Sequence, residues 1–211
     1  MTTTFTDRRQ AGRLLAAELG RYRGDAGVLV LALPRGGVPV AHEVALALDA
    51  PLDVLVVRKL GAPGHRELAV GAIASGGARV FNEDVVRWLR LDDATLDRIA
   101  ADERQELARR EALYRGDEPA LSATGRTVIL VDDGVATGAT MLVALHALRQ
   151  LGAGRLVVAA PVGAPDSLER LEQAADEVVC LARPPYLVSV GQWYDDFSQT
   201  SDAEVRALLD A

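Results

Sequence analysis

Short apolar runs recur along the chain and end at glycine, proline or charged residues. Runs of this kind are typical of strands that are buried on both faces of a parallel sheet. The pattern predicts core strands at 28–33, 53–57, 128–131, 156–160 and 177–181. Two further short strands, at 68–73 and 78–81, are predicted to form a hairpin around Ser75-Gly76-Gly77.

Between these runs, apolar residues return at the spacing of a helix. Helices are predicted at 6–22, 38–48, 83–89, 92–115, from Thr140 onward, at 165–175 and at 202–209. Strands that alternate with helices predict an α/β fold with a doubly wound, mainly parallel sheet. We expect residues 1–211 to form one domain, because this length suits a single core.

Residues 82–118 are predicted to be a helical insertion between core strands. The apolar stripe of its longer helix is narrow, so one face of this helix is exposed to solvent or contacts a partner. The insertion could cover an active site, form a dimer interface or only decorate the fold. In the first helix, Arg8, Arg9 and Arg13 are expected to form a solvated face.

Charge and composition narrow the class of protein. A net charge of -7 and a pI near 5.0 argue against a general nucleic-acid binder. Cys180 is the only cysteine, which fits a reducing cytoplasm. The polar start at 2–10 and the lack of a membrane-length apolar run predict a cytoplasmic protein without a membrane partner.

Lysine usage singles out one position. Of the 23 basic residues only Lys59 is a lysine, and the others are arginines. This position either needs a compact ammonium group or keeps its lysine by chance.

The most informative stretch is 127–145. The strand at 128–131 runs into Asp132 and Asp133, then into a loop of small residues and a helix. A strand, a glycine-bearing loop and a helix N-terminus direct backbone N–H groups toward an anion such as a phosphate. Carboxylates beside a phosphate need hydroxyls or a cation on the same ligand. A ribose 5-phosphate satisfies both halves, whereas the alternative is an ordinary strand-to-helix turn.

This stretch resembles the phosphoribosyl pyrophosphate (PRPP) signature of the type I phosphoribosyltransferases. The resemblance rests on two acids followed by Thr-Gly-x-Thr. It implies that Asp132 and Asp133 hold the ribose hydroxyls and, through those hydroxyls or water, Mg²⁺. It also implies that the 5-phosphate lies on the loop residues Gly134, Val135, Ala136, Thr137, Gly138, Ala139 and Thr140.

A second loop, Pro34-Arg35-Gly36-Gly37, follows the strand at 28–33. Ligands of open α/β folds bind at this end of the strands, and glycines let the backbone approach them closely. The loop resembles the pyrophosphate loop of the same family, in its bacterial xanthine/guanine form. The resemblance implies a catalytic Arg35 and pyrophosphate on the amides of Gly36 and Gly37, although Arg-Gly-Gly alone is also compatible with an ordinary turn.

The strand at 53–57 runs into Arg58-Lys59 and a glycine- and proline-rich stretch that ends at Glu67. The pattern indicates a mobile, positively charged lid, with a surface hairpin as the alternative. It resembles the flexible loop of orotate and adenine phosphoribosyltransferases. That resemblance implies a catalytic Lys59 and substrate contacts from Arg58, His65 and Arg66, unless His65 is only a solvated loop histidine.

The tail at about 183–200 resembles the C-terminal hood of hypoxanthine-guanine enzymes. Its aromatic residues include Trp193, Tyr194 and Phe197, which could stack on a base or pack into the core. Hypoxanthine-guanine enzymes carry an acid before the Thr-Gly pair, where this chain has Ala136. The acceptor therefore stays open.

Taken together, the resemblance implies a Mg²⁺-dependent transferase of nucleotide metabolism. It would move ribose 5-phosphate from PRPP to a nitrogen of a nucleobase or related small acceptor, release pyrophosphate and act as a homodimer. A PRPP-sensing regulatory protein without catalysis is the alternative. A generic nucleotide-binding enzyme such as a methyltransferase is disfavoured, because no G-x-G-x-x-G fingerprint is present.

Overall fold

The structure is a computed structural model that describes residues 4–116 and 119–211, with the side chains of Arg66 and Glu67 outside the description. Its centre is a five-stranded parallel sheet in the order β2-β1-β6-β7-β8. The strands are β2 (Leu52–Val54), β1 (Val28–Ala32), β6 (Thr127–Val131), β7 (Arg155–Val162) and β8 (Glu177–Ala182). The predicted parallel sheet is confirmed.

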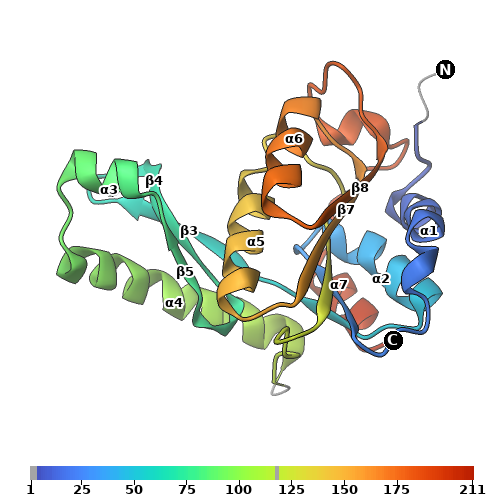
Figure 1. Ribbon diagram of the computed structural model, residues 1–211, viewed down its shortest axis with the longest axis horizontal. Coiled ribbons are helices and arrows are strands. Elements are labelled where there is room, and N and C mark those ends of the chain that lie inside the picture. Colours follow the sequence, from blue (N-terminus) through green and yellow to red (C-terminus); the bar gives the residue numbers. More distant parts are fainter. Residues whose placement is uncertain (1–3, 117–118) are drawn as a thin grey trace.

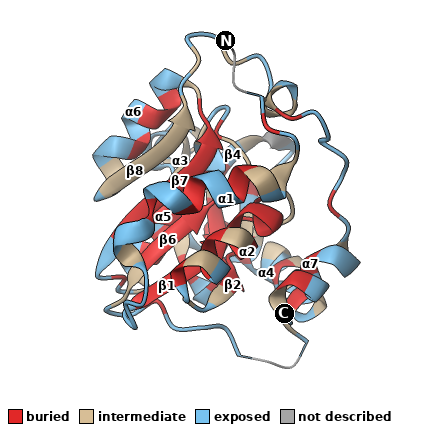
Figure 2. Ribbon diagram, turned by 90° about the vertical axis from the view of Figure 1, so that its right-hand side faces the viewer, coloured by how far each residue is buried: buried red, intermediate tan, exposed pale blue. Residues whose placement is uncertain are grey.

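Helices cover both faces of this sheet, as a doubly wound fold requires (Figure 1). One face carries α1 (Arg8–Glu18) and α2 (Gly37–Leu48), and the other carries α5 (Ala139–Gln150) and α6 (Pro165–Ala174). Successive strand residues point to opposite faces, so each strand contributes to two cores. In β6, Ile129 packs with α2 and Leu130 packs with α5. Figure 2 shows these buried residues gathered in the strands and on the helix surfaces that face them.

The segment 58–67 forms a hairpin, which was the alternative prediction, in place of the loop. The strand predicted at 53–57 is interrupted after Val54, and β3 (Val57–Ala62) begins a separate sheet with β4 (His65–Ala74) and β5 (Arg79–Phe81). Where the loop was expected, β3 and β4 form an antiparallel hairpin with a turn at 63–64 and register shifts on either side of Gly61. The reason is burial, because Leu60 and Ala62 point into a core that only the folded chain supplies.

That core comes from the predicted helical insertion. The helices α3 (Glu83–Leu89) and α4 (Asp93–Arg115) confirm the predictions at 83–89 and 92–115, and residues 117–118 lie outside the described part. Leu96, Ala100 and Leu107 of α4 pack in the same cluster as Leu60 of the hairpin. Hairpin and helices together form one arm that projects from the parallel sheet (Figure 1).

A buried ion pair attaches the arm to the sheet. Nε of Arg115, at the end of α4, lies 2.7 Å from Oδ1 of Asp53 in β2, and both side chains are under 10% exposed. The other oxygen of Asp53 accepts the N–H of Leu121 at 2.9 Å. The sequence did not predict this ion pair, because its two residues lie on elements that are distant in the sequence.

The C-terminal tail is irregular, as predicted, apart from a short 3-10 turn at Val190–Trp193. It ends in α7 (Asp202–Leu209), which packs against α4 and α2. The tail also pairs with the start of the chain, where the N–H of Phe5 donates to the Trp193 carbonyl at 2.7 Å. Within the described residues, we find no helix of the length and apolarity that crossing a membrane requires.

Candidate active site

The two predicted ligand loops leave the sheet side by side. They follow β1 and β6, which are neighbouring strands paired in register from Val28↔Thr127 to Ala32↔Val131. The strand order reverses between β1 and β6, and open α/β sheets bind ligands at such a switch point. The structure thus brings the Arg35 loop and the acid pair together.

Close contact between the loops explains both glycines of the first. A β-carbon at Gly36 would overlap the Asp133 carboxylate, and one at Gly37 would lie 2.8 Å from the Val131 carbonyl oxygen. Neither position has room for a side chain. Gly36 and Gly37 are therefore required by the packing of one loop on the other, besides any contact with a ligand.

The acid pair is half-buried. Asp132 accepts the backbone N–H of Asp133 on Oδ1 at 2.8 Å, and Asp133 Oδ2 accepts Nε–H of Arg8 at 2.8 Å. Burial raises the pKa of Asp132 well above its ordinary value, and the adjacent Asp133 charge raises it further. Burial also raises the pKa of Asp133, against the opposing effect of Arg8. The pair therefore favours a partner that brings hydroxyl donors or positive charge.

The rest of the acid-bearing loop divides into two parts. Ala136, Thr137, Ala139 and Thr140 are exposed around the start of α5, where a phosphate could reach the helix N-terminus. Gly138 caps that helix at a φ of 71°. Val135 differs from its prediction, because its side chain is buried and its N–H donates to the Val162 carbonyl at 2.8 Å. Val135 is a core residue here, and its amide is not free for a phosphate.

Gly134 belongs to the interface between this loop and the tail. A β-carbon there would lie 2.5 Å from the Val190 side chain. The predicted hood thus packs directly on the loop that follows the acids.

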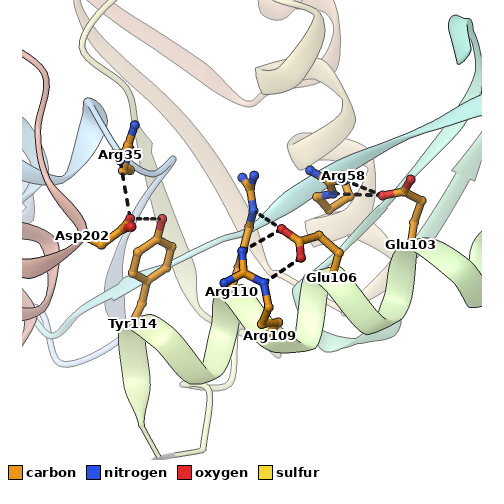
Figure 3. A network of polar contacts seen from close by, with 8 residues as sticks. All are labelled: Arg35, Arg58, Glu103, Glu106, Arg109, Arg110, Tyr114 and Asp202. Atoms are coloured by element: carbon orange, nitrogen blue, oxygen red, sulfur yellow. Dashed lines mark hydrogen bonds and ion pairs between the residues drawn. The ribbon is translucent and has the colours of Figure 1, made fainter.

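Arg35 is about one-third exposed and is held by the C-terminal helix. Its Nη1 lies 3.7 Å from Oδ1 of Asp202, the first residue of α7, and the same oxygen accepts the Tyr114 hydroxyl at 3.1 Å. Figure 3 shows this contact and the charged side chains that follow it along α4. Two helices distant in the sequence therefore meet at the predicted pyrophosphate loop.

Arg58 and Lys59 lie on opposite faces of the hairpin, since successive strand residues alternate. Arg58 donates from Nε and Nη2 to Glu103 of α4 at 3.0 and 2.6 Å (Figure 3). Lys59 is exposed and makes no hydrogen bond or ion pair with the described residues. Glu103 therefore occupies Arg58, while Lys59 is available to a ligand.

His65 is not brought to the acid pair. It is exposed at the turn of the hairpin, opposite Ala62. Ala62 lies four positions along β3 from Arg58, a span of about 14 Å. The structure places His65 at the tip of the projecting arm, and the Arg66 side chain lies outside the described residues.

The aromatic residues of the tail are packed rather than presented. Tyr194 is 6% exposed, and its ring lies 5.5 Å from that of Phe5 and 5.2 Å from that of Phe197. Its hydroxyl donates to the Asp133 carbonyl at 2.5 Å. Trp193 packs into the same cluster. Of the two interpretations, core packing is correct for Tyr194, and base stacking on its ring is wrong because the ring is covered.

Two residues of this region were not predicted from the sequence. Arg8, expected on a solvated face, instead binds Asp133, and its side chain is only 11% exposed. Tyr186, in the segment after β8, is 88% exposed, against 37% for Phe197, which stacks with Arg8. Tyr186 follows two prolines beyond the end of a predicted strand, and this position could have indicated that its side chain is exposed. The sequence around Arg8 gave no indication of its contact with Asp133.

The donor set suits Mg²⁺ held partly by its ligand. No group of three or more metal-binding side chains occurs within residues 4–116 and 119–211, and the site offers the two carboxylates of Asp132 and Asp133. Mg²⁺ is commonly bound through one or two carboxylates together with substrate phosphates and water. The residues present therefore fit that ion.

Comparisons with known proteins agree on the family. The family model described as "Phosphoribosyl transferase domain" matches residues 4–190. A crystal structure of TT1426 from Thermus thermophilus superposes with a TM-score of 0.86 at 47% identity, covering 98% of this chain and 97% of that one.

Proteins that are similar in sequence support the same family. A Mycobacterium tuberculosis protein, named provisionally as a phosphoribosyl transferase, is 52% identical over 206 residues, or 98% of this chain. The match covers 46% of that relative, so the chain spans about half the length of the curated relatives it matches most fully. A ribose-phosphate pyrophosphokinase of Pyrococcus furiosus is 41% identical over 71 residues, 33% of this chain and 25% of that protein. The match over residues 4–190, together with the paired loops after β1 and β6, shows that the chain belongs to the phosphoribosyl transferase domain family.

Proposed function

We propose that the chain binds PRPP at the switch point between β1 and β6. It transfers the ribose 5-phosphate to a nitrogen of a nucleobase or related small acceptor. The observation that carries this proposal is the contact between the Arg35-Gly36-Gly37 loop and the Asp132-Asp133 pair. It offers the Arg35 cation and the Gly36 amide for pyrophosphate beside carboxylates for the ribose hydroxyls.

Each part of the ligand has a matching part of the site. The 5-phosphate lies at the exposed start of α5, around Thr137 and Thr140. Asp132 and Asp133 accept the ribose hydroxyls, and Arg35 with the amide of Gly36 holds the pyrophosphate. The predicted contact from the Gly37 amide is not part of this proposal, because its N–H donates to the Leu33 carbonyl at 3.1 Å. We also expect Asp132 and Asp133 to hold Mg²⁺ through these hydroxyls or water, and its charge would stabilise the departing pyrophosphate.

In the reaction, the bond between ribose C1 and the pyrophosphate oxygen breaks while the acceptor nitrogen bonds to C1 from the other side. The nitrogen loses its proton to solvent, and pyrophosphate leaves with the electron pair of the broken bond. Positive charge develops on the ribose, and the carboxylates of the acid pair stabilise it. Lys59 is exposed and makes no ion pair with the described residues, and it would neutralise charge on the pyrophosphate. Tyr186 replaces Trp193 and Tyr194 as the aromatic residue we expect at the acceptor.

The test is pyrophosphate release from Mg²⁺-PRPP with adenine, guanine, hypoxanthine, xanthine, uracil, orotate and simple amines in turn. We expect release with one acceptor or a small group of them. Arg35→Gln and Lys59→Ala should each reduce turnover at least about tenfold, the cost of losing one charge-assisted contact. Arg13→Gln, on the exposed side of α1, is the control and should match the wild type.

A PRPP-sensing regulator is the second candidate. The internal ion pairs on Arg35 and Asp133 favour it, because a ligand that displaces them would change how α7 and α1 are held. PRPP that raises the melting temperature without release for any acceptor would support this function. Acceptor-dependent turnover would exclude it.

A further inference from the structure

Arg8 is the cation that reaches the acid pair from the start of the chain. It is the first residue of α1, whose N-cap Asp7 accepts the N–H of Gln10 at 2.7 Å. From there the guanidinium donates from Nε to Asp133 Oδ2 at 2.8 Å and from Nη1 to the Ser198 carbonyl at 2.7 Å. It also lies 3.9 Å from the centre of the Phe197 ring. One side chain therefore joins α1, the acid pair and the tail.

The Asp133 carboxylate is confined on several sides. Gly36 packs against it so closely that no β-carbon would fit. Arg8 occupies Oδ2, and the Tyr194 hydroxyl holds the backbone carbonyl of the same residue. Of these contacts, only the one from Arg8 is a directional bond to the carboxylate from another segment of the chain. Oδ1 is left to receive a ligand.

We propose that Arg8 is a positioning residue, which orients the Asp133 carboxylate for a ribose hydroxyl and fixes the 197–198 segment against it. This inference rests on the proposed function, since it assigns a role at the same site. It adds a residue from a part of the chain that neither ligand loop contains. Arg8 does not touch the reacting atoms and acts only through Asp133.

The geometry calls for an arginine at this position. A planar guanidinium donates in two directions at once, whereas an ammonium group is a point charge on a flexible stem. Arg8 uses both directions, toward Asp133 and toward Ser198, and it stacks on Phe197 as well. A lysine would keep the charge and lose the second bond or the stacking.

The neighbouring arginines of α1 provide a matched control. Arg13 lies 3.5 Å from Glu43 with its side chain 58% exposed, on the side of α1 away from the acid pair. Arg13→Gln changes the net charge by the same amount as Arg8→Gln and replaces an arginine of the same helix. A difference between the two variants therefore reports on the contact with Asp133.

The experiment is calorimetric titration of the full chain in Mg²⁺ with three separate probes: PRPP, ribose 5-phosphate and pyrophosphate. We expect Arg8→Gln to weaken ribose 5-phosphate and PRPP binding about tenfold or more, the cost of losing a charge-assisted contact. Arg8→Lys should fall between Arg8→Gln and the wild type. Pyrophosphate alone should bind within about twofold of the wild type, since it does not use the ribose hydroxyls.

The outcomes separate this inference from the proposed function. If the wild type binds PRPP and Arg8→Gln binds it equally well or more tightly, Arg8 is not a positioning residue. An equal loss for all three probes would assign Arg8 a merely structural role. If the wild type binds none of the probes, the proposed function fails, and the role of Arg8 fails with it. Thermal unfolding of both Arg8 variants shows whether each one folds.

Discussion

At the scale of single residues, the main feature of the candidate site is the close packing of its two loops, which leaves no space for a side chain at Gly36 or Gly37. Gly36 and Gly37 touch the acid-bearing loop, and Asp132 and Asp133 lie half-buried against them. The sequence placed these four residues in the site by motif alone. It did not show that Val135 faces the core, and it left core packing and base stacking open for Tyr194, because a motif does not reveal which side chains the rest of the fold covers.

A methyl group at Gly36 tests the contact between the loops. Gly36→Ala would put a β-carbon into the Asp133 carboxylate, so we expect the free energy of unfolding to fall by about 1–3 kcal/mol. We also expect the variant to lose PRPP binding. Urea unfolding and calorimetric titration measure the two effects. Gly20→Ala is the control, since nothing lies within 4 Å of its β-carbon, and it should leave stability within about 1 kcal/mol of the wild type.

The acid pair should make stability depend on pH. Because the pKa of Asp132 is raised in the folded state, the folded chain retains a proton that the unfolded chain loses above its ordinary value of 3.8. Folding stability therefore falls as pH rises from 3.8 to the folded pKa. We expect Asp132→Asn to gain stability relative to the wild type across this window and then to stay level, as urea unfolding in EDTA would measure.

Asp176 supplies a comparison of opposite sign. Its pKa is lowered, first by the Leu156 N–H that it accepts, so its contribution to stability is present above 3.8 and is lost as pH falls. Asp176→Asn should therefore lose stability relative to the wild type as pH rises. Parallel curves for the two variants would contradict the assignment for Asp132.

At the scale of elements, strands and helices were predicted well where one face of the element is apolar. The core strands and α3, α4 and α7 lie within a few residues of their predictions. For the segment 58–67 the sequence left a loop and a hairpin open, because its glycines and proline are typical of a loop and its buried face is covered only by α4. A strand whose buried face meets a helix distant in the sequence shows no strong local pattern.

The ion pair between Arg115 and Asp53 joins the arm to the sheet. Removing one partner leaves a buried charge uncompensated, so Arg115→Met should cost about 3–5 kcal/mol in the free energy of urea unfolding. The exposed pair of Arg87 and Asp84 on α3 is the control, and Arg87→Met should cost no more than about 1 kcal/mol. Similar losses for both variants would mean that the buried pair does not hold the arm.

The contact between α7 and the Arg35 loop is weaker than the buried pair of Arg115 and Asp53. Asp202 is partly exposed and lies 3.7 Å from Arg35, where it would also repel a bound pyrophosphate. We expect Asp202→Asn to increase pyrophosphate affinity by up to about fivefold, the range of an exposed ion pair. Glu204→Gln removes the same charge from the same helix and should leave the affinity unchanged in calorimetric titration. Weaker binding by Asp202→Asn would mean that Asp202 positions Arg35.

At the scale of the whole molecule, the parallel sheet carries both ligand loops at its switch point, and the arm and the tail extend from it (Figure 1). The termini of the described chain both contribute, since Arg8 and Asp202 reach the two loops. Both ends of the described chain therefore contact the candidate site.

Cys180 in β8 reports on that global fold. Burial raises the pKa of its thiol to about 11, so little thiolate exists in the folded protein at about pH 8. We expect iodoacetamide to modify it slowly in the native state, and at the rate of a free cysteine peptide in urea. Rapid modification without urea would show that β8 opens at the edge of the sheet.

Local sequence was enough to specify the strands and helices with a clear apolar face, and the two loops that carry Arg35 and the acid pair. These signals are local, because periodicity and motif spacing extend over only a few residues. The groups that hold those loops were specified by the packing of the whole fold. Arg8 meets Asp133 across 125 positions, and Tyr194 meets the same residue across 61. Such contacts depend on how the sheet and its helices pack, which no short stretch of sequence encodes.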